Sequence, residues 1–251
     1  MKIVTYNIRC VYNKIDGINS FIHRIGPMFE KINEEKPDVI GFQEVLSSHL
    51  TVLEKLLGDE YQIVGQFRNA DYSGEGVYTA IRKETCQLLG FETIWLSPTP
   101  YVAGSRFDDQ SSCPRICLQT LVREKETGRR IRIYNLHLDH ISESARVEGI
   151  TSALSFIDDY SKKDGFPTAL LGDFNATPDS ETVKICKEKG GLIDATENIK
   201  VSFHHFGTEE LKIDYIFLSS ELNEAAKPAK AWDETFNTIF LSDHYPIEVE
   251  L

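Results

Sequence analysis

Residues 168–180, TALLGDFNATPDS, contain the pattern that decides the fold, a short apolar run followed at once by polar side chains. A short apolar run bounded by turn residues is typical of a buried β-strand. Asp173 and Asn175 stand two positions apart, and side chains with that spacing point the same way on an extended chain. They are therefore either a carboxylate and an amide that face one phosphate together, or the Asx hydrogen bonds of a simple turn.

The same pattern recurs along the chain, because strand after strand ends in a group able to bind metal or phosphate. The polar side chains in or beside apolar runs are Asn7, Glu44, Asn135, His137, Asp173, Asn175, Asp214, Asp243 and His244. Loop-rich strand ends are where open sheets place their sites. Each residue alone is equally explained without a function, as a solvated strand end or as a buried polar group with a hydrogen-bond partner. Together they favour one functional site.

Predicted helices and strands alternate at the two ends of the chain, whereas the middle part is predicted to contain only strands. One expected helix spans 18–36, a second begins at 47 or 48 and a third begins at about 142. The expected strands are 3–6, 39–42, 61–64, 76–81, 88–96, 116–123, 131–140, 168–171, 212–217 and 245–251. Turns between the middle strands suggest antiparallel pairing. Residues 97–114 read as a long loop that shapes a substrate pocket. The pattern favours an α/β protein with two packed sheets flanked by helices.

Composition points to a single globular domain over residues 1–251, with 41% hydrophobic and 26% charged residues. The 39 acidic and 27 basic residues give a net charge of -12, so the overall field disfavours nucleic acid as a partner. There is no apolar leader and no run long enough to span a bilayer, so we expect a cytoplasmic protein without membrane insertion.

Several residues have a chemical interpretation that competes with a structural one. Glu44 offers a hard oxygen ligand suited to magnesium or calcium, and Asp243 with His244 suits acid-base work or phosphate binding. Arg115 is able to clamp a phosphate, although arginine is common on surfaces. His204 and His205 are not expected to form a metal pair, because adjacent side chains on a strand point to opposite faces.

The five cysteines are expected to be reduced thiols, since no CxxC pair suggests zinc or redox chemistry. Cys113 and Cys117 lie close together in the sequence. A structural role or an incidental disulfide is favoured over metal binding for this pair, because no other soft ligands cluster nearby.

Nine motifs together resemble those of the endonuclease/exonuclease/phosphatase superfamily, which includes deoxyribonuclease I, abasic-site endonucleases, inositol phosphate phosphatases, sphingomyelinases and deadenylases. In chain order they are TYNIR, GFQE, GEGVYTAI, WLSPTP, CPRICLQT, NLHLDH, GDFNATPDS, KIDYIF and SDHYPI, and they span nearly the whole chain. The resemblance implies a four-layered α/β sandwich, with two packed mixed sheets, outer helices and an active site at one end.

The resemblance also implies a metal site and a water-activating group. Glu44 looks like the principal metal ligand, helped directly or through water by Asn7 and Asp243, with Mg²⁺ as the metal and Mn²⁺ as the alternative. Asp173 would orient or deprotonate the attacking water, and Asn175 would hold a phosphate oxygen or a second metal.

By the same resemblance, two histidines and an arginine would contact the phosphate. His244, paired with Asp214, would stabilise the transition state, and His137 would do so from the other side, oriented by Glu75. Arg115 resembles the arginine that family members use near the phosphate.

Departures from the family patterns narrow the substrate. KIDYIF replaces the Trp-Cys-Asp-Arg segment of inositol polyphosphate phosphatases, and Arg9 replaces the acidic residue usual in abasic endonucleases. The segments WLSPTP, CPRIC and NLHLDHISESAR look most like a bacterial subgroup. The expected function is a divalent-metal-dependent hydrolase that cleaves a phosphomonoester or phosphodiester with activated water. A metal-dependent nuclease and a catalytically silent binding protein on the same fold are the alternatives.

Overall fold

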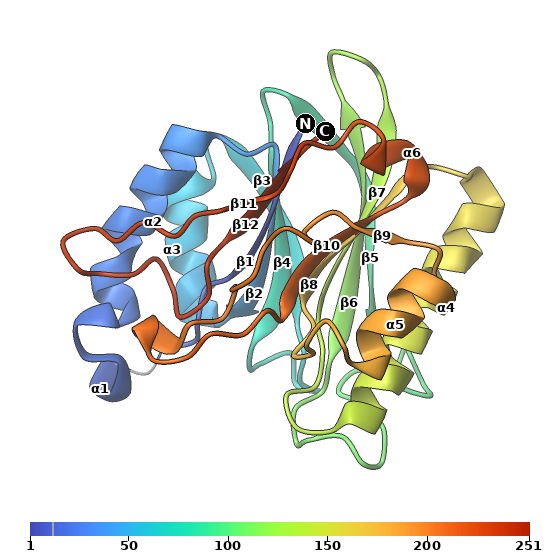
Figure 1. Cartoon of the computed structure of the whole chain (residues 1–251), viewed down its shortest axis with the longest axis horizontal. Coiled ribbons are helices and arrows are strands. Elements are labelled where there is room, and N and C mark those ends of the chain that lie inside the picture. Colours follow the sequence, from blue (N-terminus) through green and yellow to red (C-terminus); the bar gives the residue numbers. More distant parts are fainter. Residues whose placement is uncertain (12) are drawn as a thin grey trace.

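Two six-stranded mixed sheets pack face to face, with helices on both outer surfaces (Figure 1). The computed structural model describes residues 1–11 and 13–251. The first sheet has the order β11-β12-β1-β2-β4-β3 and the second β5-β6-β7-β8-β10-β9. These layers confirm the expected α/β sandwich.

The first sheet contains one parallel pair within otherwise antiparallel neighbours. Its strands are β1 (Lys2–Asn7), β2 (Val39–Val45), β3 (Tyr61–Phe67), β4 (Gly76–Arg82), β11 (Lys230–Ala231) and β12 (Ile247–Glu250). Strands β1 and β2 are parallel, with Asn7 opposite Gln43. Both therefore end at the same edge of the sheet.

The second sheet repeats this arrangement with β7 and β8 as its parallel pair. Its strands are β5 (Cys86–Trp95), β6 (Ile116–Glu124), β7 (Arg130–His137), β8 (Thr168–Asp173), β9 (Ile193–Asp194) and β10 (Asp214–Leu218). His137 lies opposite Asp173 in the parallel ladder, and Asp214 lies opposite Asp173 in the antiparallel one. Three chemically active side chains thus share one edge.

Helices cover the outer face of each sheet (Figure 1). The helical elements are α1 (Asn13–Asp16), η1 (Gly17–Asn19), α2 (Phe21–Glu35), α3 (Ser47–Leu57), α4 (Glu143–Asp164), α5 (Glu181–Glu188), η2 (His205–Gly207) and α6 (Ser220–Asn223). One apolar core joins α2 and α3 to the first sheet and another joins α4 and α5 to the second. A third core fills the space between the sheets. None of the described helices is long and apolar enough to cross a lipid bilayer.

Several element boundaries differ from those expected. Helix α2 begins at Phe21, because Ser20 has an extended backbone that separates it from η1. Strand β7 ends at His137. Beyond it the chain turns, because the Asp139 carboxylate accepts hydrogen bonds from the backbone N–H groups of Ile141 and Ser142. Strand β10 starts at Asp214 rather than 212, and β12 covers only Ile247–Glu250.

Helix α5 was not expected from the sequence. Ser180 caps this helix by accepting a hydrogen bond from the Val183 N–H. The sequence signal was therefore present, as a serine before an apolar helical repeat. The long loop at 97–114 and the antiparallel middle strands agree with expectation.

A buried polar contact joins the two sheets close to the chemically active edge. Gln43 Nε2 donates to Asn135 Oδ1 at 2.7 Å, and both side chains are fully buried. Asn135 Nδ2 donates in turn to the Tyr78 carbonyl at 3.0 Å. A Cβ on Gly41 would stand 2.2 Å from Leu171 Cδ1, so this glycine permits the close approach of the sheets. The contact holds the sheet edges in register.

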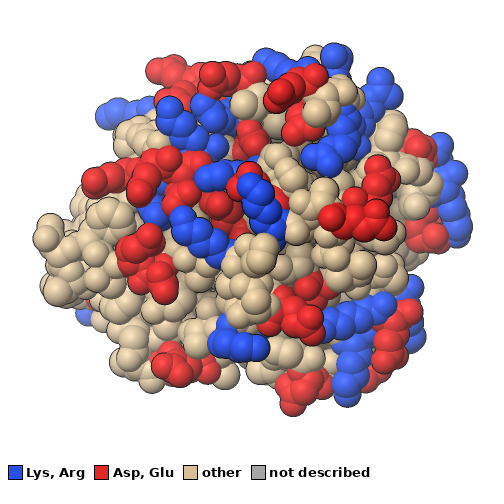
Figure 2. Space-filling view, turned by 45° about the horizontal axis from the view of Figure 1, so that its top comes forward, with Lys and Arg blue, Asp and Glu red and all other residues tan. Residues whose placement is uncertain are grey.

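The face that carries the chain termini shows acidic and basic side chains intermixed (Figure 2). Glu35 pairs there with Lys2, Lys31 and Lys230 at 3.1, 3.0 and 2.7 Å. Although partial burial opposes it, these lysines lower the pKa of Glu35 to about 2. The net negative charge is therefore partly neutralised at this end of the molecule.

Arg24 on α2 is completely buried and binds backbone carbonyls from three segments. Its guanidinium donates to the carbonyls of Asn19, Ile8, Leu241 and Arg9 at 2.7, 2.9, 3.0 and 3.3 Å. Ile8 and Arg9 follow Asn7, and Leu241 precedes Asp243. Arg24 thus ties together the two segments that carry these candidate metal ligands.

We expect Arg24→Met to lower the free energy of unfolding by at least about 3 kcal/mol, because several buried carbonyls lose their donors. Urea denaturation provides the measurement. Arg123→Met, at an exposed position, is the matched control and should change stability by less than about 0.5 kcal/mol. Equal midpoints for the two variants would contradict the structural role of Arg24.

Candidate active site

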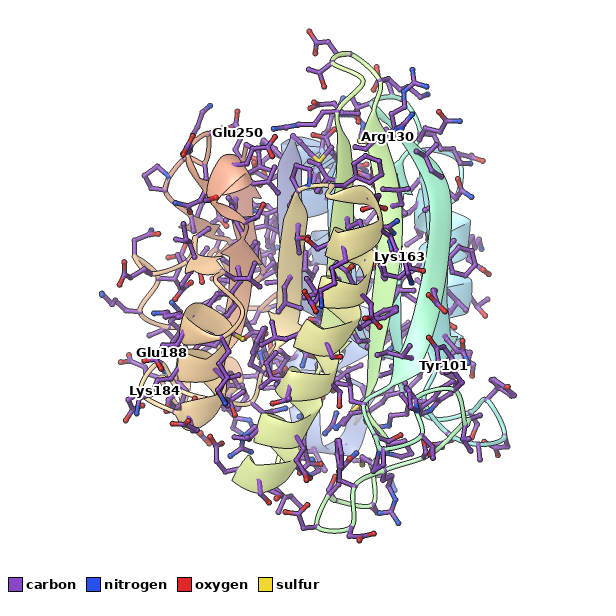
Figure 3. All side chains as sticks on the ribbon, turned by 90° about the vertical axis from the view of Figure 1, so that its right-hand side faces the viewer. Tyr101, Arg130, Lys163, Lys184, Glu188 and Glu250 are labelled. Atoms are coloured by element: carbon purple, nitrogen blue, oxygen red, sulfur yellow. The ribbon has the colours of Figure 1, made fainter. Side chains whose placement is uncertain are left out.

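A cleft of about 530 Å³ opens where β1, β2, β7 and β8 end. It is lined by Arg9, Cys10, Glu44, Arg68, Glu75, Cys113, Arg115, His137, His140, Asp173, Asn175, Thr177, Phe203, Leu211, Ile213, Asp243 and His244. Tyr101, in the long loop, lies at one end of the molecule in Figure 3, whereas Arg130 and Glu250 lie at the other. Arg130 starts β7 and Glu250 ends β12, so the cleft is at the Tyr101 end.

The Asn7 side chain connects two carboxylates that come from different sheets. Its Nδ2 donates to Glu44 Oε1 at 3.2 Å and to Asp173 Oδ2 at 2.9 Å. Backbone N–H groups bind the remaining oxygens, Cys10 N on Glu44 Oε2 and Asn175 N on Asp173 Oδ1, both at 2.8 Å. The two carboxylates are thereby held at a fixed separation.

Backbone geometry turns two of these residues toward the cleft. Glu44 and Asn175 have φ values of 60° and 48°, in the left-handed region. Glu44 also lies within an irregularity of the β2–β4 ladder between Phe42 and Val45. Such a conformation costs on the order of 1 kcal/mol or more for a non-glycine residue and is concentrated at functional sites. Bulges likewise redirect side chains next to active sites.

Two histidines approach Asp173, His137 from the end of β7 and His244 from the segment that precedes β12. His137 Nε2 lies 3.5 Å from Asp173 Oδ2, and His244 Nε2 lies 3.9 Å from the same oxygen. His244 Nδ1 donates to Asp214 Oδ2 at 2.8 Å, so the expected pairing of these two residues is present. This contact directs the other nitrogen of His244 toward Asp173 and the cleft.

The surroundings drive the two histidines to opposite charge states. Burial alone would lower the pKa of His244, but the carboxylates of Asp214, Asp243 and Asp173 raise it to about 10. Burial and the nearby cations, chiefly Arg115, hold the pKa of His137 well below its usual value. At neutral pH the metal-free site therefore pairs a cationic His244 with a neutral His137.

Asp173 has a pKa suited to proton transfer near neutrality. Burial is the main cause of its rise to about 7, and the nearby Asp214 carboxylate adds to it. By contrast, burial raises the pKa of Glu44 less than hydrogen bonds from Cys10 and the charge of His244 lower it. The site thus holds one ionised carboxylate beside one poised to gain or lose a proton.

One end of the cleft is cationic, and we call Arg68, Arg115 and His140 the arginine wall. Arg115 is 4% exposed, and its Nη2 contacts His140 Nδ1 at 2.9 Å. Its Nε and Nη1 are buried and make no hydrogen bond with any residue that the structure describes. Arg68 Nη1 pairs with Glu75 Oε2 at 2.5 Å. Unused guanidinium donors beside a cleft suit an anionic ligand.

The opposite end is apolar, and we call Phe203, Leu211, Ile213 and Thr177 the Phe203 wall. The Phe203 ring centroid lies 4.9 Å from that of His244. Backbone hydrogen bonds join Phe203 to Leu211, and Tyr245 N to the Ser202 carbonyl. The wall is thus anchored directly to the segment that carries His244.

The structure brings all the residues expected in the site to one end of the fold, with two differences in pairing. Glu75 was expected to orient His137, but its carboxylate pairs with Arg68, and among the described residues no hydrogen bond joins Glu75 to His137. Asp243 Oδ2 lies 3.2 Å from Arg9 Nη1. Burial, together with Glu44, raises the pKa of Asp243.

Two groups of side chains within the described ranges could hold a metal ion. Glu44, His137 and Asp173 form one group, and Asp173, Asp214 and His244 form the other; in each, one ligand atom per residue lies within 4.8 Å of the others. Carboxylate oxygens favour hard divalent cations. Burial is the main cause that raises the pKa of Asp173, the Asp214 carboxylate adds to the rise, and a bound cation would favour the ionised carboxylate. The donor set therefore fits a hard divalent cation.

His204 and His205 contact different aromatic rings. His204 stacks on Tyr245 at 4.0 Å, while the His205 ring lies 5.8 Å from that of Phe203, so the pair diverges. None of the five cysteines, each in a described part of the chain, forms a disulfide. Cys113 is half-buried and lines the cleft from the long loop.

Arg68, His140 and the Phe203 wall were not identified from the sequence. Arg68 follows a strand that extends three residues beyond its expected end, and nothing in its neighbourhood signals a site. His140 lies within the motif NLHLDH, so its position beside His137 was a usable signal. The members of the Phe203 wall come from separate segments that only the fold brings together.

Two mixed sheets with carboxylates, amides and histidines at one shared end define a class of phosphoester hydrolases. A model described as the Endonuclease/Exonuclease/phosphatase family matches residues 4–244. This chain belongs to that family. No curated protein sequence matches the chain.

Solved structures of three bacterial proteins share the whole fold. A conserved protein of unknown function from Enterococcus faecalis V583 is 27% identical, with a TM-score of 0.88. A family member from Bacteroides vulgatus is 28% identical, also with a TM-score of 0.88. A mannosyl-6-phosphatase from Bacteroides thetaiotaomicron VPI-5482 is 25% identical, with a TM-score of 0.87. Each match covers 100% of this chain and 98% of the other.

The raised pKa of His244 predicts a stability that falls at high pH in the metal-free protein. Because the folded pKa, about 10, exceeds the ordinary 6.5, the stabilisation is complete below pH 6.5 and is lost as the pH rises through 10. Asp214→Asn removes the main partner, so we expect the free energy of unfolding to fall less steeply in this variant between about pH 7 and about pH 10. Urea denaturation across that range measures both slopes, and equal slopes would contradict the assignment.

Proposed function

We propose that this protein is a divalent-metal-dependent phosphomonoesterase that hydrolyses the phosphate ester of a small alcohol. The observation that carries the proposal is the position of Asp173, held by Asn7 beside Glu44 and facing His137 and His244 in one cleft. Such a centre supplies a metal ligand, a base for water and donors for phosphate oxygens, which together are sufficient for in-line attack by water.

Glu44 is the residue that we assign to the metal ion, with Asn7 and Asp243 close to it. Glu44 is held ionised by the Cys10 N–H and by cationic His244, and Mg²⁺ is the expected ion, with Mn²⁺ as the alternative. When bound, the ion supplies Lewis-acid stabilisation of the charge that develops on the phosphate.

Asp173 is the residue that we assign to the attacking water. Its pKa of about 7 lets the carboxylate accept a proton near neutral pH. The hydrogen bonds from Asn7 and the Asn175 backbone fix both of its oxygens, so the base is preorganised.

His244, His137 and Asn175 are assigned to the phosphate. Cationic His244 is oriented by Asp214 and keeps its Nε2–H for a phosphate oxygen. Neutral His137 adds a donor or acceptor without a second positive charge. Asn175 Nδ2 uses one hydrogen on the Leu138 carbonyl at 3.1 Å and retains the other for the substrate. Donors fixed before the reaction are the main source of transition-state stabilisation.

The arginine wall favours a monoester over a diester. A phosphomonoester carries up to two negative charges, and Arg115 and Arg68 both have buried N–H groups that make no hydrogen bond with a described residue, with Arg115 Nε 3.9 Å from Asp139 Oδ2. Glu75 holds Arg68 in place through their ion pair. The mannosyl-6-phosphatase among the similar structures is consistent with this substrate class.

Asp173→Asn should lower kcat by about 100-fold or more, because the amide accepts no proton from water. The measurement is phosphate release from small phosphomonoesters with Mg²⁺ or Mn²⁺, with the urea midpoint as a check on folding. Asp59→Asn, at an exposed position that follows α3, is the matched control and should retain full activity. Absence of turnover by the wild type with any metal and any phosphate ester would instead support a silent binding protein.

Glu44→Gln should raise the metal concentration needed for half-maximal activity by about tenfold or more, since a neutral amide is a weaker ligand than a carboxylate. Titration of activity with Mg²⁺ measures this shift. An unchanged metal requirement would contradict the assignment of Glu44 to the ion.

Arg115→Met should reduce kcat/KM for a phosphomonoester by about tenfold or more, and reduce that for a matched phosphodiester less, since the monoester offers more charge to the guanidinium. Alkyl phosphates and dialkyl phosphates with the same alcohol form the comparison. Faster cleavage of DNA or RNA than of any monoester would overturn the proposal in favour of a nuclease.

A further inference from the structure

The backbone around His140 is fixed on both sides. Leu138 N donates to the Asp173 carbonyl at 2.9 Å. The Asp139 carboxylate accepts from Ser111 N at 3.3 Å and from Ile141 N and Ser142 N at 2.9 and 2.8 Å. His140 therefore has a defined position at the edge of the cleft, although its side chain is exposed.

The contact with Arg115 determines which ring nitrogen of His140 carries the proton. A guanidinium has only donors, so in the 2.9 Å contact His140 Nδ1 must act as the acceptor. The proton of the neutral ring is then on Nε2. Burial and the charge of Arg115 both lower the pKa of His140, which agrees with a neutral ring.

The second ring nitrogen of His140, Nε2, is not engaged by Arg115. His140 lines the cleft, and its Nε2 makes no hydrogen bond with any residue in the parts of the chain that the structure describes. Arg115 is almost completely buried, whereas His140 is exposed, so the two residues occupy different depths of the same wall. Arg115 reaches the inner part of a bound substrate and His140 the outer part.

We propose that His140 is a specificity-determining residue whose Nε2–H donates a hydrogen bond to a hydroxyl group on the alcohol part of the substrate. This inference rests on the proposed phosphomonoesterase function and defines its substrate class as phosphate esters of polyhydroxylated compounds. Arg115 acts here as a positioning residue, because it sets the tautomer of His140.

A neutral donor at the outer part of the cleft suits a hydroxyl oxygen better than a second anion. An anionic group would be bound more strongly by a charged donor, and the contact with Arg115 disfavours a charged His140. A hydroxyl group, by contrast, offers an acceptor oxygen without bringing another charge into the cleft. With a substrate that lacks this hydroxyl, the His140 Nε2–H would donate its hydrogen bond to water instead.

The kinetic test compares substrates that differ only in hydroxyl groups. Propyl phosphate has none, glycerol 3-phosphate has two, and hexose 6-phosphates have several. We expect His140→Ala to lower kcat/KM for the best hydroxylated substrate by about tenfold, mainly through KM, and to leave propyl phosphate within about twofold. His140→Gln, whose amide also donates, should recover part of the loss. His23→Ala, at an exposed position on α2, is the control and should match the wild type.

An equal loss for propyl phosphate and the hydroxylated substrates would overturn the proposal, since it would place His140 on the phosphate or in the scaffold. No loss for either substrate would overturn it as well. Both results leave the proposed function intact, because the wild type still hydrolyses monoesters. Failure of the wild type on every monoester would instead reject the proposed function and this inference together.

The tautomer is tested independently of activity. Ring ¹⁵N NMR of the metal-free protein at pH 7 should show His140 as the neutral Nε2–H form, with its signals assigned by their absence in His140→Gln. Arg115→Met should shift His140 toward a mixture of tautomers. A protonated ring or an Nδ1–H form in the wild type would overturn the proposal.

Discussion

The amide of Asn7, which holds Glu44 and Asp173 together, is the contact on which the site depends. The two carboxylates belong to different sheets, so their separation is set by how the sheets pack. Buried like charges repel strongly unless donors or a cation compensate for them. The fold provides donors from Asn7 and from backbone N–H groups, while burial and, after it, the Asp214 carboxylate still raise the pKa of Asp173. A divalent cation is the natural complement of such a centre.

The polar network behind this contact keeps the edge rigid. Gln43 and Asn135 join the sheets one layer deeper, and Gly41 lets them approach. Arg24 fixes the loops on either side through their carbonyls. Preorganised donors lower an activation barrier only when they do not have to move during the reaction. The buried connections therefore serve chemistry as well as stability.

Charge is distributed along the cleft in a way that composition does not reveal. The chain has a net charge of -12, yet one end of its cleft is formed by Arg68, Arg115 and His140. The opposite end, at Phe203, is apolar. Two residues of the same type thus differ in charge because their surroundings differ, since His244 is cationic and His137 is neutral.

The sequence by itself determined the α/β class, most strands and the residues at their ends, because apolar periodicity and polar strand ends are local patterns. It indicated Glu44, Asp173 and His244 as members of one site. Only the tertiary structure decided that Glu75 pairs with Arg68 and that Arg115 sets the tautomer of His140. Those partners are set by the packing of distant segments, and so are the pKa values, because burial and neighbouring charges exist only in the folded chain.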